Sequence, residues 1–539
     1  MKALTAAEMR EVDRLTTERH GISGAQLMEN AGSAVADVAR NEVSLRFQSP
    51  VRQILVLCGK GNNGGDGFVA ARHVRQEFRH TTVALFGKPE ELRGDPALNF
   101  KRWHDEGGET VLIANEADWN AVFARIQRAD VIVDALLGTG LRGAATGLIA
   151  GAIAELNTFS RNATSPMPAL IISVDMPSGL PSDGEPTQGQ VLRAHTTVTF
   201  TAPKIGQLLS DDADCCGNLI VRSIGSPDSL VEELGKGNIY WSSPEEFANF
   251  ALTRPANSHK GLYGHVLVIA GAVGKIGAAV LAGLGALKGG AGLVTIATPD
   301  AAQPTVAEQQ PEYMTEPLPT LPDGSIAIAS VDDAAFKNVL AGKTVLAIGP
   351  GLGQIDGTQK FIRALVQAAT LPTILDADGL NAFAGKADAL RERKSEFLAI
   401  TPHPGEMARL LGISNREVQK DRVRMATEAA KRWNVYVLLK GFHTILASPA
   451  GQIFVNTTGN PGLAKGGSGD VLTGILAALT GQFGTTDWLR VLALGAWLHG
   501  RAADTLTDDA DPSGIVASEV ARAIPCARLE LLQEIRRGG

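Results

Sequence analysis

Two glycine-rich segments near opposite ends of the chain constrain its fold most strongly. They are CGKGNNGGDG at 58–67 and NPGLAKGGSGD at 460–470. Each follows residues typical of a strand and precedes apolar residues at helical spacing. Glycines let a backbone approach a ligand closely, and the free N–H groups of a helix start attract anions. Because each segment also carries an aspartate, we expect chemistry beside a nucleotide at two places in the chain.

Length and composition indicate a soluble protein of two domains. At 539 residues the chain is too long for one ordinary core, and 44% hydrophobic with 20% charged residues is typical of globular proteins. The net charge of −7 argues against a broad nucleic-acid surface. The four cysteines lack zinc-ligand spacing, and the chain shows neither a signal-peptide core nor a membrane-length apolar run. We therefore expect a cytoplasmic protein without nucleic-acid or membrane partners.

The first half repeats strand–loop–helix units, which predict a parallel sheet covered by helices. Expected strands at 54–57, 131–133 and 170–174 lead into NNGGDG, Asp134 and Asp175 respectively. The carboxyl ends of parallel strands share one edge of a sheet, where such folds bind ligands. These three segments should therefore lie side by side.

The second half restarts the pattern after a stretch with little periodicity at 223–243. Its expected strands are 266–270, 293–297, 345–348, 374–375, 398–400 and 435–439, and its expected helices include 279–288 and the residues after GGSGD. We predict a first domain at 1–225, a linker at 226–240 and a second domain at 241–535. Both halves show the strand–loop–helix pattern, but their sequences contain no repeat that can be aligned.

Several first-half residues suit acid–base work beside a cation. Asn63, Asp134 and Ser178 offer oxygen ligands, Asp175 can act as a base, and Lys204 can be its charged partner. Each also has a structural explanation: a tight strand-to-helix turn for the glycines, a cap for Asp175 and an exposed lysine for Lys204. The glycine spacing departs from GxGxxG, so dehydrogenase chemistry is not indicated.

In the second half, GGSGD places Asp470 at a helix start just after an anion-binding turn. There it can take a proton from a substrate hydroxyl while neighbouring N–H groups hold a phosphoryl group, or it can simply cap the helix. His403 stands between two prolines, where it can satisfy backbone groups, and Lys440 can face solvent. Residues 376–381, DADGLN, can carry magnesium or cap the next helix, and we assign them to neither role.

Four first-half segments resemble the epimerase domain of the NAD(P)H-hydrate repair enzymes: NNGGDG at 62–67, DALLGTGLRG at 134–143, VDMPSG at 174–179 and FTAPKIG at 200–206. The resemblance implies a Rossmann-like three-layer αβα domain that interconverts R and S hydrates of NADH or NADPH beside potassium. It implies catalysis by Asp175 with Lys204, and potassium held by Asn63, Asp134 and Ser178. The implied substrate contacts are Asn62, Asn63, Gly64, Gly65, Asp66, Gly138, Thr139, Gly140, Leu141, Arg142, Gly143, Ala144 and Asp175.

Six second-half segments look like the ADP-dependent NAD(P)H-hydrate dehydratase: 259–271, 277–294, 348–353, 401–412, 439–444 and 459–470. This resemblance implies a ribokinase-like αβα domain in which ADP phosphorylates the hydrate hydroxyl and phosphate then leaves, with Asp470 as base and Mg²⁺ as cofactor. The implied hydrate contacts are Ala282, Gly351, Gly353, His403 and Asp470. The implied ADP contacts are Lys440, Gly441, Phe442, His443, Thr444 and Gly469.

Together the halves predict a bifunctional enzyme that epimerises NAD(P)H hydrates and dehydrates the S epimer at the expense of ADP, giving NAD(P)H, AMP and phosphate. We expect a homo-oligomer with small-molecule substrates. A kinase for a vitamin or sugar hydroxyl is one alternative, although it leaves the first half unexplained. A nucleotide-binding sensor or scaffold without catalysis is the other.

Overall fold

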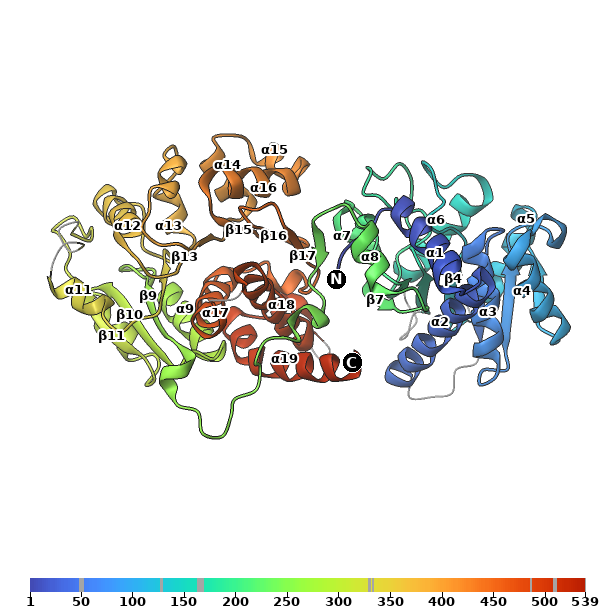
Figure 1. Cartoon of the computed structure of the whole chain (residues 1–539), viewed down its shortest axis with the longest axis horizontal. Coiled ribbons are helices and arrows are strands. Elements are labelled where there is room, and N and C mark those ends of the chain that lie inside the picture. Colours follow the sequence, from blue (N-terminus) through green and yellow to red (C-terminus); the bar gives the residue numbers. More distant parts are fainter. Residues whose placement is uncertain are drawn as a thin grey trace. The chain divides into compact units, whose positions relative to one another are not determined.

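The computed structural model describes residues 1–47, 53–126, 129–161, 169–327, 331, 334–484, 487–507 and 511–538. Its contacts separate into two compact units (Figure 1): Lys2–Gly237, and Asn238–Gly539 together with Met1. Residues 226–240, the expected linker, contain a helix, α8 (Asp228–Leu234), and most of a strand, β8 (Ile239–Trp241). None of the described helices is long and apolar enough to cross a membrane.

The first unit contains a seven-stranded sheet in the order β3-β2-β1-β4-β5-β6-β7, and every neighbouring pair is parallel. Its strands are β1 (Ile54–Cys58), β2 (Thr81–Leu85), β3 (Glu109–Leu112), β4 (Val131–Ala135), β5 (Leu170–Val174), β6 (Thr196–Phe200) and β7 (Asn218–Arg222). Its helices besides α8 are α1 (Ala6–His20), α2 (Gly24–Arg46), α3 (Asn62–Arg75), α4 (Gly94–Asp105), α5 (Glu116–Ile126), α6 (Gly147–Arg161) and α7 (Ile205–Leu209).

Alternation along the central strands divides the first unit's core into two layers. Val56 and Val133 pack with residues of α2, α3 and α4, whereas Leu57 and Ile132 pack with residues of α5 and α6. All five residues of β1 are buried, as expected for a parallel strand covered on both faces. The unit is therefore a three-layer αβα domain, which confirms the predicted fold class.

The parallel order brings the carboxyl ends of β1, β4 and β5 together, as predicted. Two local expectations were wrong. Asp134 lies inside β4 rather than after it, because the strand continues to Ala135. NNGGDG is not a loop but the start of α3, which begins at Asn62, because its buried glycines pack closely against the rest of the unit.

The second unit contains a ten-stranded sheet in the order β11-β10-β9-β12-β13-β14-β15-β16-β17-β8. Only β16 runs antiparallel to its neighbours. The strands besides β8 are β9 (His265–Ile269), β10 (Leu293–Pro299), β11 (Met314–Leu318), β12 (Val345–Ile348), β13 (Thr373–Leu375), β14 (Leu398–Ile400), β15 (Tyr436–Leu439), β16 (Thr444–Ala447) and β17 (Ile453–Asn456).

Helices lie on both sides of this sheet (Figure 1), so the second unit is also αβα. One side carries α9 (Ile276–Lys288), α17 (Ser468–Phe483), α18 (Trp488–Leu506) and α19 (Ala517–Gly538). The other carries α12 (Asp356–Ala368), α13 (Asp378–Asn381), α14 (Pro404–Leu411), α15 (Asn415–Lys420) and α16 (Arg422–Trp433). The remaining helices are α10 (Gln303–Ala307) and α11 (Ala334–Leu340).

Small residues let α9 and α17 pack closely. A Cβ atom added at Gly474 would lie 1.9 Å from the Ala282 carbonyl oxygen, and one added at Gly285 would lie 2.2 Å from the Val471 carbonyl oxygen. No side chain fits into either gap, so the glycines are required where they stand. This contact fixes α17, whose first turn carries Asp470.

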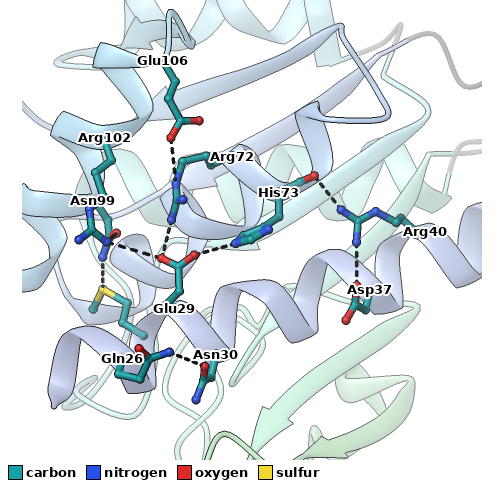
Figure 2. Close-up of polar contacts among 11 residues, drawn as sticks. Gln26, Glu29, Asn30, Asp37, Arg40, Arg72, His73, Asn99, Arg102 and Glu106 are labelled. Carbon is teal, nitrogen blue, oxygen red and sulfur yellow. Dashed lines mark hydrogen bonds and ion pairs between the residues drawn. The ribbon is translucent and has the colours of Figure 1, made fainter. Parts of the chain in front are cut away.

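An ion-pair cluster fastens α3 to α2 and α4 (Figure 2). Glu29 of α2 accepts from Arg72 Nη2 at 2.5 Å and lies 2.7 Å from His73 Nε2, both on α3, and 3.6 Å from Arg102 of α4. Burial works to raise the pKa of Glu29, but the hydrogen bonds from His73 and Arg72 outweigh it and hold that pKa below its ordinary value of 4.5. The cluster therefore stabilises α3, the helix that begins with NNGGDG.

We expect Glu29→Gln to lower the free energy of unfolding by about 1–2 kcal/mol at pH 7, because one partly buried carboxylate contacts two arginines and a histidine. A carboxyl whose pKa is lowered by folding stabilises above pH 4.5, and that contribution is lost as the pH falls through the folded-state value. Calorimetry of the full chain at pH 7 and pH 4 measures this. The control, Glu77→Gln, removes an exposed partner of Arg40 and should cost under about 0.5 kcal/mol. An equal loss in both variants would contradict the prediction.

Candidate active sites

The first unit holds a cavity of about 680 Å³ at the shared strand edge. Its wall includes Asn62, Asn63 and Asp66 from α3, residues 138–142 after β4, Asp175 after β5 and Lys204 after β6. These segments are far apart in sequence, and the parallel order brings them to one place. Most of the predicted epimerase residues thus meet in one cavity.

The beginning of α3 presents free backbone donors at this edge. Gly61 precedes the helix and provides no side-chain cap, so the first N–H groups are not satisfied by a capping side chain. The first intrahelical bond joins Gly65 N to the Gly61 carbonyl at 3.1 Å. Free N–H groups and the helix dipole both favour an anion at this point.

Asp175 and Lys204 form the closest ion pair in the cavity. Lys204 Nζ donates to Asp175 Oδ1 at 2.5 Å and to Thr199 Oγ1 at 2.8 Å, although the lysine side chain is 1% exposed. The backbone of Asp175 is held in the left-handed region at φ 59°, with Gln207 Nε2 donating to its carbonyl at 2.7 Å. A buried ammonium and a strained backbone together aim this carboxylate, which is typical of a functional position.

Asp134 and Ser178 are fully buried and joined to Asn63 through Leu137. Ser178 Oγ donates to Asp134 Oδ1 at 2.6 Å, and the Leu137 N–H donates to Ser178 Oγ at 2.9 Å. Asn63 Nδ2 donates to the Leu137 carbonyl at 3.0 Å, while its Oδ1 is buried and has no partner among the described residues. Burial raises the pKa of Asp134, against hydrogen bonds from Ser178 and Ser173. The cluster is rich in oxygen and contains one orphaned acceptor.

Four predicted substrate contacts lie outside the wall of this cavity: Gly64, Gly65, Gly143 and Ala144. Gly64 and Gly65 are buried, and side chains there would collide with Gly59 and Met28. Several wall residues were not predicted, among them the acid Asp13 of α1. A lone acid on a polar amphipathic helix gives no sequence signal of a site, because its approach to β5 and β6 depends on the tertiary fold.

The second unit holds a cavity of about 440 Å³ at the carboxyl ends of β13, β14 and β15. Five predicted residues line it: His403, Lys440, Gly441, Gly469 and Asp470. Asp376, for which the sequence left both magnesium binding and helix capping open, lines it as well. The α17 start supplies the facing wall, with Gly467 in the left-handed conformation at φ 95° just before the helix.

Lys440 is the charged centre of this second site, rather than a solvent-facing side chain. Its Nζ donates to Asp376 Oδ1 at 2.8 Å and lies 3.9 Å from Glu406 Oε2. Burial works to lower the pKa of Lys440, but Asp376 and Glu406 outweigh it, so that pKa is raised. Thr473 Oγ1 donates a hydrogen bond to the second carboxylate oxygen, Asp376 Oδ2, at 2.7 Å. The lysine is therefore held as a cation at the strand edge.

Asp470 is the unpaired carboxyl of the second site. No hydrogen bond joins its carboxyl group to another side chain among the described residues of the cavity. Burial raises the pKa of Asp470 to about 7, with Asp376 adding to the shift and Lys440 opposing it. A free carboxyl that titrates near neutral pH, at the first turn of a helix, suits a general base.

Backbone contacts hold the segments around Asp470. His403 caps α14, its Nδ1 accepting from Gly405 N at 3.0 Å, and burial with Lys440 nearby lowers its pKa. Gly353 N donates to Asp378 Oδ2 at 2.8 Å, so Asp378 acts structurally here. Arg422 braces the KGFHT turn by donating to the Leu439 carbonyl at 3.1 Å and to the Phe442 carbonyl. Arg422 was not predicted, because only the fold brings α16 to this turn.

Six predicted contacts of the second unit do not line its cavity: Ala282, Gly351, Gly353, Phe442, His443 and Thr444. Ala282 is buried in the α9–α17 contact, as ordinary helix packing would have it. Phe442 is 53% exposed and stacks on His443 with ring centroids 4.0 Å apart. The ligand contacts of these residues stay predictions.

Comparison with known proteins matches both units. Residues 24–206 match the family described as YjeF-related protein N-terminus, and residues 266–526 match NAD(P)H-hydrate dehydratase. A Moorella thermoacetica protein, the bifunctional NAD(P)H-hydrate repair enzyme Nnr, is 39% identical over 99% of this chain and 98% of its own length. The chain belongs to this family of bifunctional NAD(P)H-hydrate repair enzymes.

Other members and one solved structure are similar. The Escherichia coli repair enzyme Nnr is 34% identical over 96% of this chain and 92% of its own. A Bacillus subtilis ADP/ATP-dependent NAD(P)H-hydrate dehydratase, co-crystallised with ATP and Mg²⁺, is 32% identical and covers 55% of this chain and 99% of its own, with a TM-score of 0.47. In this repair enzyme, the first cavity is lined mainly by residues of the first matched region, and the second cavity by residues of the second matched region. Asp13 lines the first cavity but precedes the first matched region.

The glycines at the start of α3 give a test of the first repair-enzyme site. A Cβ atom at Gly64 would lie 2.0 Å from the Gly59 carbonyl oxygen, whereas one at Gly61 meets nothing within 4 Å. We expect Gly64→Ala to lower the unfolding free energy by about 1–3 kcal/mol through overpacking, and Gly61→Ala to be nearly neutral. Denaturant unfolding of both variants measures this. Equal stabilities would show that the close approach is not rigid.

Proposed function

We propose that this chain repairs hydrated NADH and NADPH in two steps, one in each unit. The first unit interconverts the R and S hydrates, and the second dehydrates the S epimer at the expense of ADP, giving NAD(P)H, AMP and phosphate. The observation that carries the proposal is Asp470: a carboxyl without a side-chain partner among the described residues, at a helix start, beside the partly buried cation Lys440. Membership of the repair-enzyme family along the whole chain supports the pairing.

In the first unit, Asp175 exchanges a proton with the hydroxyl group at C6 of the hydrate. Lys204 keeps the Asp175 carboxylate oriented through their 2.5 Å ion pair. The start of α3 binds the diphosphate with its free N–H groups. These roles use elements that converge on one cavity of about 680 Å³.

The residues proposed to hold potassium fit such an ion. Asn63 Oδ1 is a buried acceptor without a partner in the described chain, and Asp134 and Ser178 add a carboxylate and a hydroxyl oxygen. These are the hard oxygen ligands that such cations prefer. When bound, potassium would offset the negative charges of Asp134 and the nearby phosphates.

In the second unit, Asp470 takes the proton of the C6 hydroxyl as its oxygen attacks the terminal phosphoryl group of ADP. The N–H groups of the first α17 turn stabilise the charge that develops. The ring nitrogen then expels phosphate from C6 as the N1=C6 double bond forms, and loss of a proton from C5 to solvent gives the C5=C6 double bond of NAD(P)H. Lys440 and Thr473 already donate hydrogen bonds to the two carboxylate oxygens of Asp376. Because Asp376 is occupied in this way, we propose that Mg²⁺ enters with the nucleotide phosphates. His403 borders the hydrate, and Lys440–Thr444 and Gly469 bind the nucleotide.

The assay that tests the function supplies purified protein with a mixture of hydrated NADH epimers, with and without ADP, and follows the absorbance of the reduced ring. We expect complete recovery of NADH with ADP and none without it. A stable phosphorylated product would instead support a kinase for another hydroxyl. Recovery of only one epimer would contradict the epimerase role. The expected cytoplasmic location and homo-oligomer stay predictions.

We expect Asp470→Asn to lower the dehydratase kcat by at least about 100-fold, since an amide cannot accept the proton. In the parent, kcat/KM should rise with pH through about 7, because protonated Asp470 is inactive as a base. The rate of epimerisation should not change. A parental dehydratase rate in the variant would exclude Asp470 as the base.

We expect Asp175→Asn to remove epimerisation and leave dehydration of the S hydrate intact. In the recovery assay this variant should stop after consuming the S epimer, apart from slow spontaneous interconversion. Chromatography of the remaining hydrate measures which epimer is left. Complete recovery at the parental rate would show that Asp175 is not catalytic.

A further inference from the structure

Asp13 is an acid in the first cavity that neither the sequence motifs nor the proposed mechanism uses. It lies on α1 and lines the cavity together with Asp66, Asp175 and Lys204. Its Oδ1 atom is buried and has no hydrogen-bond partner among the described residues. The other acids of α1 have structural partners: Glu8 caps the helix with Thr5, and Glu11 and Glu18 pair with Arg14. Asp13 is the one acid of α1 that lines the cavity, and its Oδ1 has no hydrogen-bond partner among the described residues.

Asp13 has no ion-pair partner of its own among the described residues, although it lies near Lys204. Three carboxyl groups face one buried ammonium, and Lys204 is already bonded to Asp175 at 2.5 Å. Burial raises the pKa of Asp13 to about 6, with Lys204 opposing and Asp175 adding to the shift. Burial also raises the pKa of Asp66 well above its ordinary value, and the charges of Asp175 and Asp13 add to it. Arg10, Lys60 and Arg142 are the other cations on the wall, and Asp95 is a further acid. Asp13 thus holds a proton more readily than an ordinary aspartate.

Inversion at C6 needs two proton-transferring groups. The hydroxyl must leave with a proton, and water must lose a proton as it returns to the opposite face of the ring. Asp175, held by Lys204, supplies one of these groups, and a second is needed for the other proton transfer. Asp13 reaches the cavity from a helix, whereas Asp175 reaches it from a strand edge. The two groups therefore come from different elements and have different environments.

We propose that Asp13 is the second acid–base residue of the epimerase site and works opposite Asp175. This inference rests on the proposed epimerase function. The Asp13 carboxyl gives its proton to the C6 hydroxyl, the C6–O bond breaks, and the N1 lone pair forms the N1=C6 double bond while water departs. Water then adds to the other face of C6, the N1=C6 pair returns to nitrogen, and Asp175 takes the released proton. The reverse reaction uses the same groups in exchanged roles, and solvent restores their protons between turnovers.

The decisive variant is Asp13→Asn in the full chain, assayed without ADP so that no hydrate is dehydrated. Chromatography follows the conversion of the isolated R hydrate to the S hydrate, with the uncatalysed rate subtracted. We expect kcat to fall by about 100-fold or more, because an amide cannot supply the proton. The dehydratase rate on the S hydrate should equal that of the parent. Glu11→Gln, an exposed acid on the same helix, is the control and should epimerise normally.

Two further readouts separate catalysis from structure. The parent's kcat/KM for epimerisation should fall as the pH rises above about 6, when Asp13 loses its proton, and the variant should lack this limb. The melting temperature of Asp13→Asn should not be lower than the parent's, because the substitution breaks no hydrogen bond of Oδ1. Asp13→Glu, which keeps the acid, should recover part of the rate.

Two results would overturn the inference. One is a parental rate in Asp13→Asn, and the other is a reduced rate in that variant with the parent's pH profile unchanged. If the parent itself fails to interconvert the hydrates, the proposed epimerase function fails instead. The parent and the variant therefore distinguish the two claims.

Discussion

One lysine ammonium held among three carboxyl groups at the edge of a parallel sheet is the interaction on which each site depends. In both units the lysine bonds to the carboxylate that directly follows a strand, at 2.5 Å and 2.8 Å. That pairing leaves the other two acids without a full counter-charge in a buried place, where proton affinity rises. The groups are Lys204 with Asp13, Asp66 and Asp175, and Lys440 with Asp376, Glu406 and Asp470.

The burial that makes the Asp470 carboxyl a better proton acceptor also lowers the stability of the fold near neutral pH. Burial raises the pKa of Asp470 from 3.8 to about 7, so the folded state prefers the protonated acid. Such a group favours folding below its unfolded value of 3.8, and this contribution is lost as the pH rises toward 7. Near neutral pH the ionised carboxylate is therefore a cost to the fold, and it is also the form that accepts a proton. The extensive α9–α17 packing stabilises the helix that carries this cost.

Local patterns predicted the features that depend on local sequence. The central strands β1, β4 and β5, their shared edge, and the positions of Asp175 and Asp470 followed from apolar runs and the residues after them, whereas β2, β3, β6 and β7 were not predicted. Asp13, Thr473 and Arg422 could not be predicted, because each reaches its partners from a helix whose position is set by tertiary packing. The glycines of NNGGDG favoured a loop by propensity, but close packing against Gly59 and Met28 holds them in α3. Tertiary contacts overrode helix propensity there.

The two aspartates of the glycine-rich segments differ because they lie at different depths in their helices. Asp470 is the third residue of α17, within the first turn, where N–H groups are free and a phosphoryl group can sit beside the carboxylate. Asp66 is the fifth residue of α3, past the Gly65 N–H that already bonds to Gly61. Its carboxyl lies beyond the free donors and among other acids, so it is suited to hold a proton rather than to assist phosphoryl transfer. The first unit therefore needs its base elsewhere, and the strand edge supplies Asp175.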